Sequence, residues 1–401
     1  MKLGTRYFKV VLLATLATLA ACASDPANLD HASAVRYANY ANKANLWLLN
    51  FATQETLYPT RWDPLQRPLE PLTESQSLDT QIAIAQLFSS HAGQQTKSAR
   101  ALSNLYQALL FGVKGPSLEF PSTQALYIAR SSMTLELQAG LLSSLLLPKQ
   151  ALITPSQEIT TQRDEMLVDL ISRVERQRSG LRARSNQIDS TVTPLMSEQT
   201  LSRALTTLAL ASQRLDRADL KALAFSLWQE IDVLYPFQSI TNQRIESTAW
   251  RISAQAQLLS IHDDPELLKS TLKLADQLAK TQDRGDYAGR FWRVKEKRRE
   301  IGPDAKLDAL STSALAAVLP LVSKHGSSWQ YRSLRKALRL GLANLREHQY
   351  EVGVVEAFPE PARAVGAVRH RYASPVVHLE TTALAALAFK QASELAWAGL
   401  L

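Results

Sequence analysis

Apolar residues recur along the chain with the spacing of amphipathic helices, and no segment shows the strict alternation of a strand. This pattern predicts an all-α protein of about twelve helices. Their approximate ranges are 31–53, 77–91, 96–112, 122–147, 161–182, 197–213, 216–234, 246–261, 264–282, 308–324, 328–348 and 376–398. Pro320 should kink or shorten the helix that contains it, because proline has no amide donor.

The predicted helices form two classes that alternate along the chain. One class is rich in Ala, Ser, Thr and Leu, and the stretch from Leu310 to Val322 carries no charge at all. Helices that are apolar all round are buried, so this class should lie inside. The other class has one apolar stripe and one charged face, as in 328–348, and should face water on one side.

The connections between helices are unequal in length. Turns from an inner helix to the next outer helix are mostly short, whereas the returns from outer to inner are long. Short turns join antiparallel neighbours, so every long loop should lie at one rim, where the inner helices begin. We therefore predict an (α/α)6 toroid, closed if 31–53 packs outside 376–398. An open α-solenoid of helical pairs is the alternative.

The N-terminus has the features of a targeting segment. Positive residues precede an apolar run, Val10 to Ala21, that is too short to span a bilayer as a helix. No linker rich in Gly, Ser or Pro divides the rest of the chain. We therefore predict a signal peptide over 1–21, a tether over 22–30 and a single toroid domain over 31–401.

The segment Leu19-Ala20-Ala21-Cys22 resembles the lipobox of bacterial lipoproteins. The resemblance implies cleavage before Cys22, which is the only cysteine in the chain, and diacylation of its thiol. Ala23 and Ser24 follow, and by resemblance to enterobacterial sorting rules the absence of Asp there favours the outer membrane, facing the periplasm. An ordinary signal peptide that happens to contain cysteine is the alternative.

The composition limits the partners. The formal net charge is +8 before the signal peptide, with its three basic residues, is removed. A mildly basic exported protein does not point to nucleic acid, but it could meet an anionic glycan or anionic lipid head groups. Only seven histidines are scattered along the chain, and H-E-x-x-H, G-x-S-x-G and Gly-rich phosphate motifs are missing. We expect no metal and no cofactor.

The alternation of helix classes resembles the six-hairpin and terpenoid-cyclase-like α/α-toroid superfamilies. The local likeness is strongest where a loop with Gly353 and Gly366 leads into His378-Leu379-Glu380-Thr381-Thr382. The resemblance implies a central cavity whose mouth is surrounded by the long-loop rim. Any substrate of this chain is then expected at that rim.

The predicted N-termini of the inner helices carry the candidate catalytic and binding groups. They are Asp79, Glu198, Glu246, Asp308, His378 and Glu380. Glu246 and Glu380 are the preferred catalytic candidates, since each precedes a Ser/Thr-Thr pair and a strongly apolar helix. Glycoside hydrolysis needs two such carboxylates across a cavity. Acidic residues in a first turn also stabilise the helix by themselves, which is the alternative interpretation.

The loops carry further candidates. In the run Arg369-His370-Arg371-Tyr372, His370 and Tyr372 could transfer a proton in a polysaccharide lyase, while Arg369 and Arg371 bind the uronate. The run could equally be a solvated basic loop. Trp62, Tyr287 and Trp292 could stack on sugar rings or could simply anchor their loops.

These observations predict a cell-envelope lipoprotein, held to the membrane by its lipid, whose toroid binds or processes an envelope or extracellular polysaccharide. If it is an enzyme, it is a glycoside hydrolase or a polysaccharide lyase. A non-catalytic scaffold that holds an envelope protein at the same rim is the alternative.

Overall fold

A computed structural model describes residues 26–51, 58–65, 77–111, 134–146, 156–185, 196–236, 245–295, 298–301, 305–371 and 374–401. Within these residues lie twelve long helices that match the twelve predicted ones. The inner helices are α3 (Leu78–His91), α5 (Leu135–Leu146), α7 (Glu198–Leu215), α9 (Ile245–Leu259), α11 (Ala305–His325) and α15 (Leu379–Trp397). The outer helices are α2 (Pro26–Phe51), α4 (Thr96–Phe111), α6 (Gln157–Ser185), α8 (Ala218–Leu234), α10 (Pro265–Lys280) and α12 (Ser328–His348).

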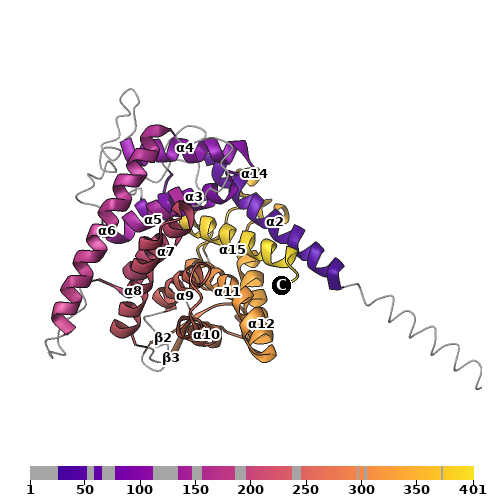
Figure 1. Cartoon of the computed structure of the whole chain (residues 1–401). Helices are drawn as coiled ribbons and strands as arrows, with labels where there is room; N and C mark the ends of the chain where they lie inside the picture. The colour runs from indigo at the N-terminus through magenta and orange to yellow at the C-terminus, as the bar shows by residue number, and fades with distance from the viewer. Residues whose placement is uncertain are drawn as a thin grey trace, which may run out of the picture.

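The inner helices form a closed ring. Each packs against the next, and α15 packs back against α3, while α2 lies along the outside of α15 (Figure 1). The outer helices surround this ring, as Figure 1 shows for α4, α6, α8, α10 and α12. The predicted (α/α)6 toroid is therefore confirmed, and the open solenoid is excluded.

The contact that closes the ring is dense. Phe389 of α15 is fully buried, and the rings of Tyr37 and Tyr40 in α2 lie 6.5 and 5.3 Å from it, centroid to centroid. Small residues of α15 let α2 approach closely, and the Ser393 hydroxyl donates a hydrogen bond to the Ala34 carbonyl at 2.9 Å. The first and last helices are thus joined by core packing and not by a surface contact.

Helix α11 is long and apolar enough to cross a membrane by length and composition, but most of it is buried as an inner helix of the ring. The prediction that Pro320 would shorten it is wrong, since α11 continues to His325. Pro320 is exposed, so its ring lies on the outer surface of the helix and not in the core.

Short strands, which the sequence pattern did not predict, connect the long loops. Strand β1 (Arg61–Trp62) pairs antiparallel with β4 (Val377–His378), and β2 (Trp292–Lys295) pairs with β3 (Arg298–Ile301). Strands of two to four residues are too short to produce a clear alternation. The β1–β4 pair ties the loop before α3 to the loop before α15. Two one-turn helices, α13 (Val352–Val355) and α14 (Pro361–Ala364), lie in the last long loop.

Two expected boundaries differ from the structure. Helix α2 begins at Pro26, so 26–30 is helical although it was predicted as tether, and proline fits a first helical turn because its missing amide is not needed there. Helix α5 begins at Leu135, and 122–133, predicted as its first part, lies outside the described residues. Residues 1–25, with the lipobox and Cys22, also lie outside them.

Candidate functional site

Every inner helix carries an acidic residue in its first turn. These residues are Asp79, Glu136, Glu198, Glu246, Asp308 and Glu380. In five of the helices the acid directly follows a buried leucine or isoleucine, namely Leu78, Leu135, Ile245, Leu307 and Leu379. One residue turns the helix by about 100°, so a side chain next to a core residue can reach the ring axis instead.

Two of the six acids stabilise the ring wall. Glu198 accepts from the Arg251 guanidinium at 3.0 Å, and both side chains are buried. Asp308, also buried, accepts from the Phe291 amide and from the Asn344 side-chain amide, each at 2.9 Å. These carboxylates have the structural role that first-turn acids often have. They leave four acids for the rim.

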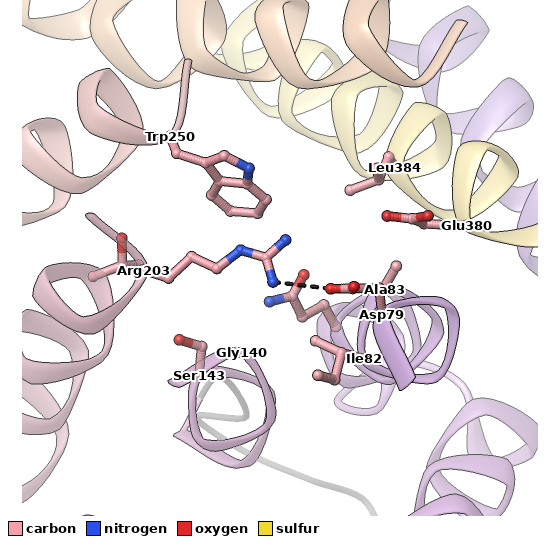
Figure 2. A pocket seen from close by; sticks show the side chains of 11 residues that line it. Asp79, Ile82, Ala83, Gly140, Ser143, Arg203, Trp250, Glu380 and Leu384 are labelled. Atoms are coloured by element: carbon pink, nitrogen blue, oxygen red, sulfur yellow. Dashed lines mark hydrogen bonds and ion pairs between the residues drawn. The ribbon is translucent and has the colours of Figure 1, made fainter. Parts of the chain in front are cut away.

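Arg203 of α7 joins two of the remaining acids. Its Nη1 lies 3.0 Å from Asp79 Oδ1 and 3.4 Å from Glu136 Oε1. Gln199 also donates to Glu136, at 2.7 Å. The Arg203 guanidinium lies 4.4 Å from the centre of the Trp250 ring, and Figure 2 shows it between that ring and Asp79. Charge and cation–π contacts therefore hold this arginine in one position.

Lys306 of α11 joins the other two acids. Its Nζ lies 2.9 Å from Glu380 Oε1 and 3.8 Å from Glu246 Oε1. Burial raises the pKa of Glu380, although the Lys306 ammonium opposes this shift. Burial alone would lower the pKa of Lys306, but the attraction of Glu380 and Glu246 outweighs it and the pKa of the ammonium is raised.

A small cavity of about 40 Å³ lies behind these groups. Its lining residues are Asp79, Ile82, Ala83, Gln86, Gly140, Ser143, Arg203, Thr206, Trp250, Glu380 and Leu384. In Figure 2, Trp250 and Arg203 face Asp79 and Glu380 across this space. The volume suits one or two waters, so a larger ligand would lie against the open side, where the side chain of Asp79 is 39 % exposed.

The two predicted histidines meet at the start of α15. The rings of His370 and His378 stack with their centroids 3.7 Å apart and their planes 3° apart. His370 Nδ1 lies 3.4 Å from the Thr381 hydroxyl, one residue after Glu380. The structure therefore brings His370 and His378 beside the first turn that carries Glu380.

The other predicted loop residues do not line the small cavity. Trp62 is buried and packs on Trp47, with ring centroids 5.6 Å apart, so its side chain anchors β1. Arg369 donates to the Glu347 carbonyl at 2.6 Å, at the end of an outer helix. Tyr287 is exposed, with the Arg290 guanidinium 5.2 Å from its ring.

Of the remaining predicted residues, Trp292 lies in β2 and Arg371 is exposed. Tyr372 lies outside the described residues. No stacking surface formed by several loop aromatics is present among the described side chains at the cavity.

Sequence reasoning missed Glu136, Arg203, Trp250 and Lys306. Glu136 had a usable signal, because Leu135-Glu136 repeats the apolar–acidic pair of Leu78-Asp79 and Leu379-Glu380. Arg203 and Lys306 were detectable only as rare charges in or beside weakly charged helices. Nothing in the sequence indicates which acids they contact.

Metal binding is not supported by the described part of the chain. It holds no group of three or more His, Cys, Asp or Glu side chains arranged to bind a metal ion. The four rim carboxylates instead have Arg203 and Lys306 as their cations.

Comparison with solved structures identifies the fold. Cellobiose 2-epimerase from Bacillus thermoamylovorans superposes with a TM-score of 0.58 and 12 % identity, over 89 % of this chain and 98 % of that one. The α-1,6-mannanase of Salegentibacter sp. gives 0.56 and 10 % identity, over 90 % and 99 %. A family 88 glycosyl hydrolase from Bacteroides vulgatus gives 0.52 and 10 %, over 91 % and 99 %.

No protein-family model matches the sequence, and no curated protein matches it. Identities of this size show a shared fold alone. The chain therefore has the (α/α)6 toroid fold of these proteins across most of its length.

Proposed function

We propose that this chain is a lipid-anchored protein of the bacterial cell envelope whose toroid binds and hydrolyses a polysaccharide at the long-loop rim. One observation carries the proposal: Asp79, Glu136, Glu246 and Glu380 come from four different inner helices to the same end of the ring axis. Further support comes from neighbours of the same fold that act on glycans, among them a mannanase variant in complex with α-1,6-mannotriose.

Glu380 is the proposed general acid. Burial raises its pKa, which favours the protonated form that an acid catalyst needs. Glu246 is the proposed second carboxylate. Because one ammonium contacts both groups, their nearest oxygens are at most roughly 7 Å apart, and this upper limit falls inside the roughly 5–9.5 Å separation that glycosidases use.

In the proposed reaction, Glu380 gives its proton to the glycosidic oxygen as the bond to the sugar carbon breaks. Glu246 takes a proton from the attacking water, and the water oxygen forms the new bond to that carbon. Lys306 positions both groups, since its Nζ lies 2.9 Å from Glu380 and 3.8 Å from Glu246.

The charge balance at this rim favours a hydrolase over a lyase. The cluster of ion pairs holds four carboxylates and two cations, so its own charge is negative and disfavours a uronate in direct contact with it. A neutral glycan meets no such repulsion. The lyase interpretation also depends on Tyr372, which the structure does not describe.

The test is to assay the detergent-solubilised full chain against neutral and uronate polysaccharides for new reducing ends and for unsaturated uronates. Glu380→Gln should lower the hydrolysis rate by about 10²–10⁴-fold, the usual contribution of a general acid. Glu356→Gln, an exposed residue of the last long loop, is the matched control. Binding without hydrolysis, or hydrolysis that survives in Glu380→Gln, would contradict this mechanism.

The non-catalytic scaffold gives a different result. It predicts no glycan binding and co-purification of an envelope protein from crosslinked cells. No specific contact among the described residues favours it, so it stands as the outcome that would replace the hydrolase proposal.

The proposed anchor is tested separately. Cys22→Ala removes the thiol that lipidation requires, so the protein should move from the membrane fraction to the soluble fraction. Cell fractionation followed by immunoblotting measures this shift, with Ser24→Ala as the control. Retention of Cys22→Ala in the outer membrane would contradict the lipoprotein assignment.

A further inference from the structure

A second, much larger cavity opens at the other end of the ring. Its volume is about 1080 Å³, at the upper end of the roughly 300–1,000 Å³ of ordinary ligand sites. All six inner helices line it, and so do Gly93, Gln94 and Ser260, which lie in the short turns after α3 and α9. We call this space the short-loop chamber.

The short-loop chamber borders the small cavity of the rim site. Gln86, Ser143, Thr206, Trp250 and Leu384 line both cavities. The Arg203 guanidinium stacks on the Trp250 ring from the rim side, 4.4 Å from the ring centre. The two cavities are therefore neighbours along one axis and share part of their walls.

The wall of the chamber combines uncharged polar side chains with apolar ones and has few charges. Its charged residues are Arg214, Lys390 and Glu394, all towards the C-terminal ends of their helices and so towards the opening. Lys390 and Glu394 pair at 2.8 Å, which cancels their charges. The deeper polar positions are hydroxyls and amides, with aliphatic residues such as Leu310 and Leu387 between them.

The direction of the hydrogen bonds in this wall restricts the ligand. Ser90, Thr206 and Ser260 donate their hydroxyl protons to backbone carbonyls of their own helices at 2.7, 3.0 and 2.6 Å. Ser313 donates to the Gln391 side chain at 2.6 Å. Each oxygen keeps acceptor capacity after donating its proton, so the wall favours a ligand that carries many O–H donors.

These features disfavour two other classes of small ligand. An acyl chain would match the aliphatic residues but would leave the remaining acceptor capacity of the hydroxyls and the glutamine side chains unused. A polyanion would need several cations, whereas the chamber offers two, and Glu394 already pairs with one. A neutral polyhydroxylated chain fits the donors, the volume and the aliphatic gaps.

We infer that the short-loop chamber is a second binding site, specific for a neutral oligosaccharide. This inference does not depend on the proposed hydrolysis at the rim, since the two sites open at opposite ends of the ring.

The test blocks the chamber and measures binding directly. Ser253 is half-buried on the α9 face that lines the chamber, so Ser253→Trp places an indole inside it. Ala317→Trp does the same from α11, on another part of the wall, and serves if the first variant does not fold. Ser172→Trp, exposed on outer helix α6, is the matched control.

Isothermal titration of the detergent-solubilised full chain would use maltohexaose, cellohexaose and α-1,6-mannotetraose, with trigalacturonate and laurate as the contrasting probes. At least one neutral probe should bind, and the chamber-filling variant should weaken that binding at least tenfold. Ser172→Trp should stay within twofold of the wild type.

Three results would overturn the inference: no neutral probe binds, the folded chamber-filling variants bind as well as the wild type, or Glu380→Gln alone abolishes binding. The last result would place the ligand at the rim. Loss of hydrolysis in Glu380→Gln with retained oligosaccharide binding would separate the two sites.

Discussion

The two ends of the helical ring are built from the same six inner helices and differ in charge and volume. At the rim end, four carboxylates and two cations surround a cavity of about 40 Å³. At the short-loop end, neutral hydroxyls and amides line about 1080 Å³. All six inner helices run in the same direction, so one end collects the first turns, where acids are favoured, and the other collects the last turns.

This difference shows how a ring of parallel inner helices can hold two unlike sites. The rim is filled because long side chains, Arg203 and Lys306, bridge between helices. The other end stays open because Ser, Ala and Gln dominate its wall. Substitutions can test whether the ion pairs, and not the helices alone, set the character of the rim.

The largest effect on stability is expected for Arg251→Met. Arg251 is fully buried between Glu198 and Asp232, with contacts of 3.0 and 2.6 Å. Removing it leaves Glu198 buried without its cation, which should cost about 3–5 kcal/mol in urea unfolding. Arg214→Met, at the opening of the short-loop chamber, is the matched control and should cost about 1 kcal/mol, since Arg214 is only partly buried. Equal losses of unfolding free energy in the two variants would contradict the prediction that the buried arginine contributes more to stability than the partly buried one.

The next effect concerns acid stability. Burial, with Arg290 and Arg369 nearby, lowers the pKa of His348 to about 4. Between pH 6.5 and 4, His348 binds a proton in the unfolded chain but not in the folded chain, so stability falls on acidification. The shift corresponds to about 3 kcal/mol at most. His348→Gln should remove most of this loss, measured as urea unfolding at pH 7 and pH 4.5.

His91, at the end of α3 on the short-loop side, is the matched control. Burial also lowers its pKa, although the Leu87 carbonyl opposes the shift. His91→Gln should therefore change the acid sensitivity in the same direction but by less. A larger effect for His91→Gln than for His348→Gln would contradict the prediction that His348 accounts for most of the acid sensitivity.

A smaller and pH-dependent effect is expected for Lys306→Met. Without the ammonium the pKa of Glu380, already raised by burial, rises further. A raised carboxyl pKa means that stability is lost as pH rises through it, so the deficit should be larger at pH 8 than at pH 5. We expect about 1–2 kcal/mol at pH 8 in urea unfolding, between the values for exposed and buried pairs.

Lys390→Met is the counterpart at the short-loop chamber. Lys390 pairs with Glu394, four residues along the same helix, and Glu394 is mostly exposed. The loss should stay below about 1 kcal/mol and show little pH dependence between 5 and 8. A matching pH dependence in both variants would argue that the Lys306 result does not report on Glu380.

Several features were readable from the sequence because they depend on local order. The alternation of uncharged and half-charged helices, together with the alternation of short and long connections, predicted the inner and outer layers and the rim where the inner helices begin, while the closure of the ring was left to the structure. First-turn acids such as Asp79, Glu246 and Glu380 were found in the same way, since a helix start has a local pattern. The strands β1 to β4 were missed because two to four residues carry too little pattern.

Only the tertiary structure decided which acids remain at the rim and which are used in the wall. Glu198 and Glu246 occupy similar positions in the sequence. In the structure, Glu198 is buried in an ion pair with Arg251, whereas Glu246 and Glu380 both contact Lys306. Trp62, which resembled a sugar platform, is buried against Trp47. The short-loop chamber could not be predicted from the sequence either, because a cavity depends on the distances between the six inner helices. Local patterns fix where a helix begins and which face is apolar, whereas pairing across the ring depends on distances that no single segment contains.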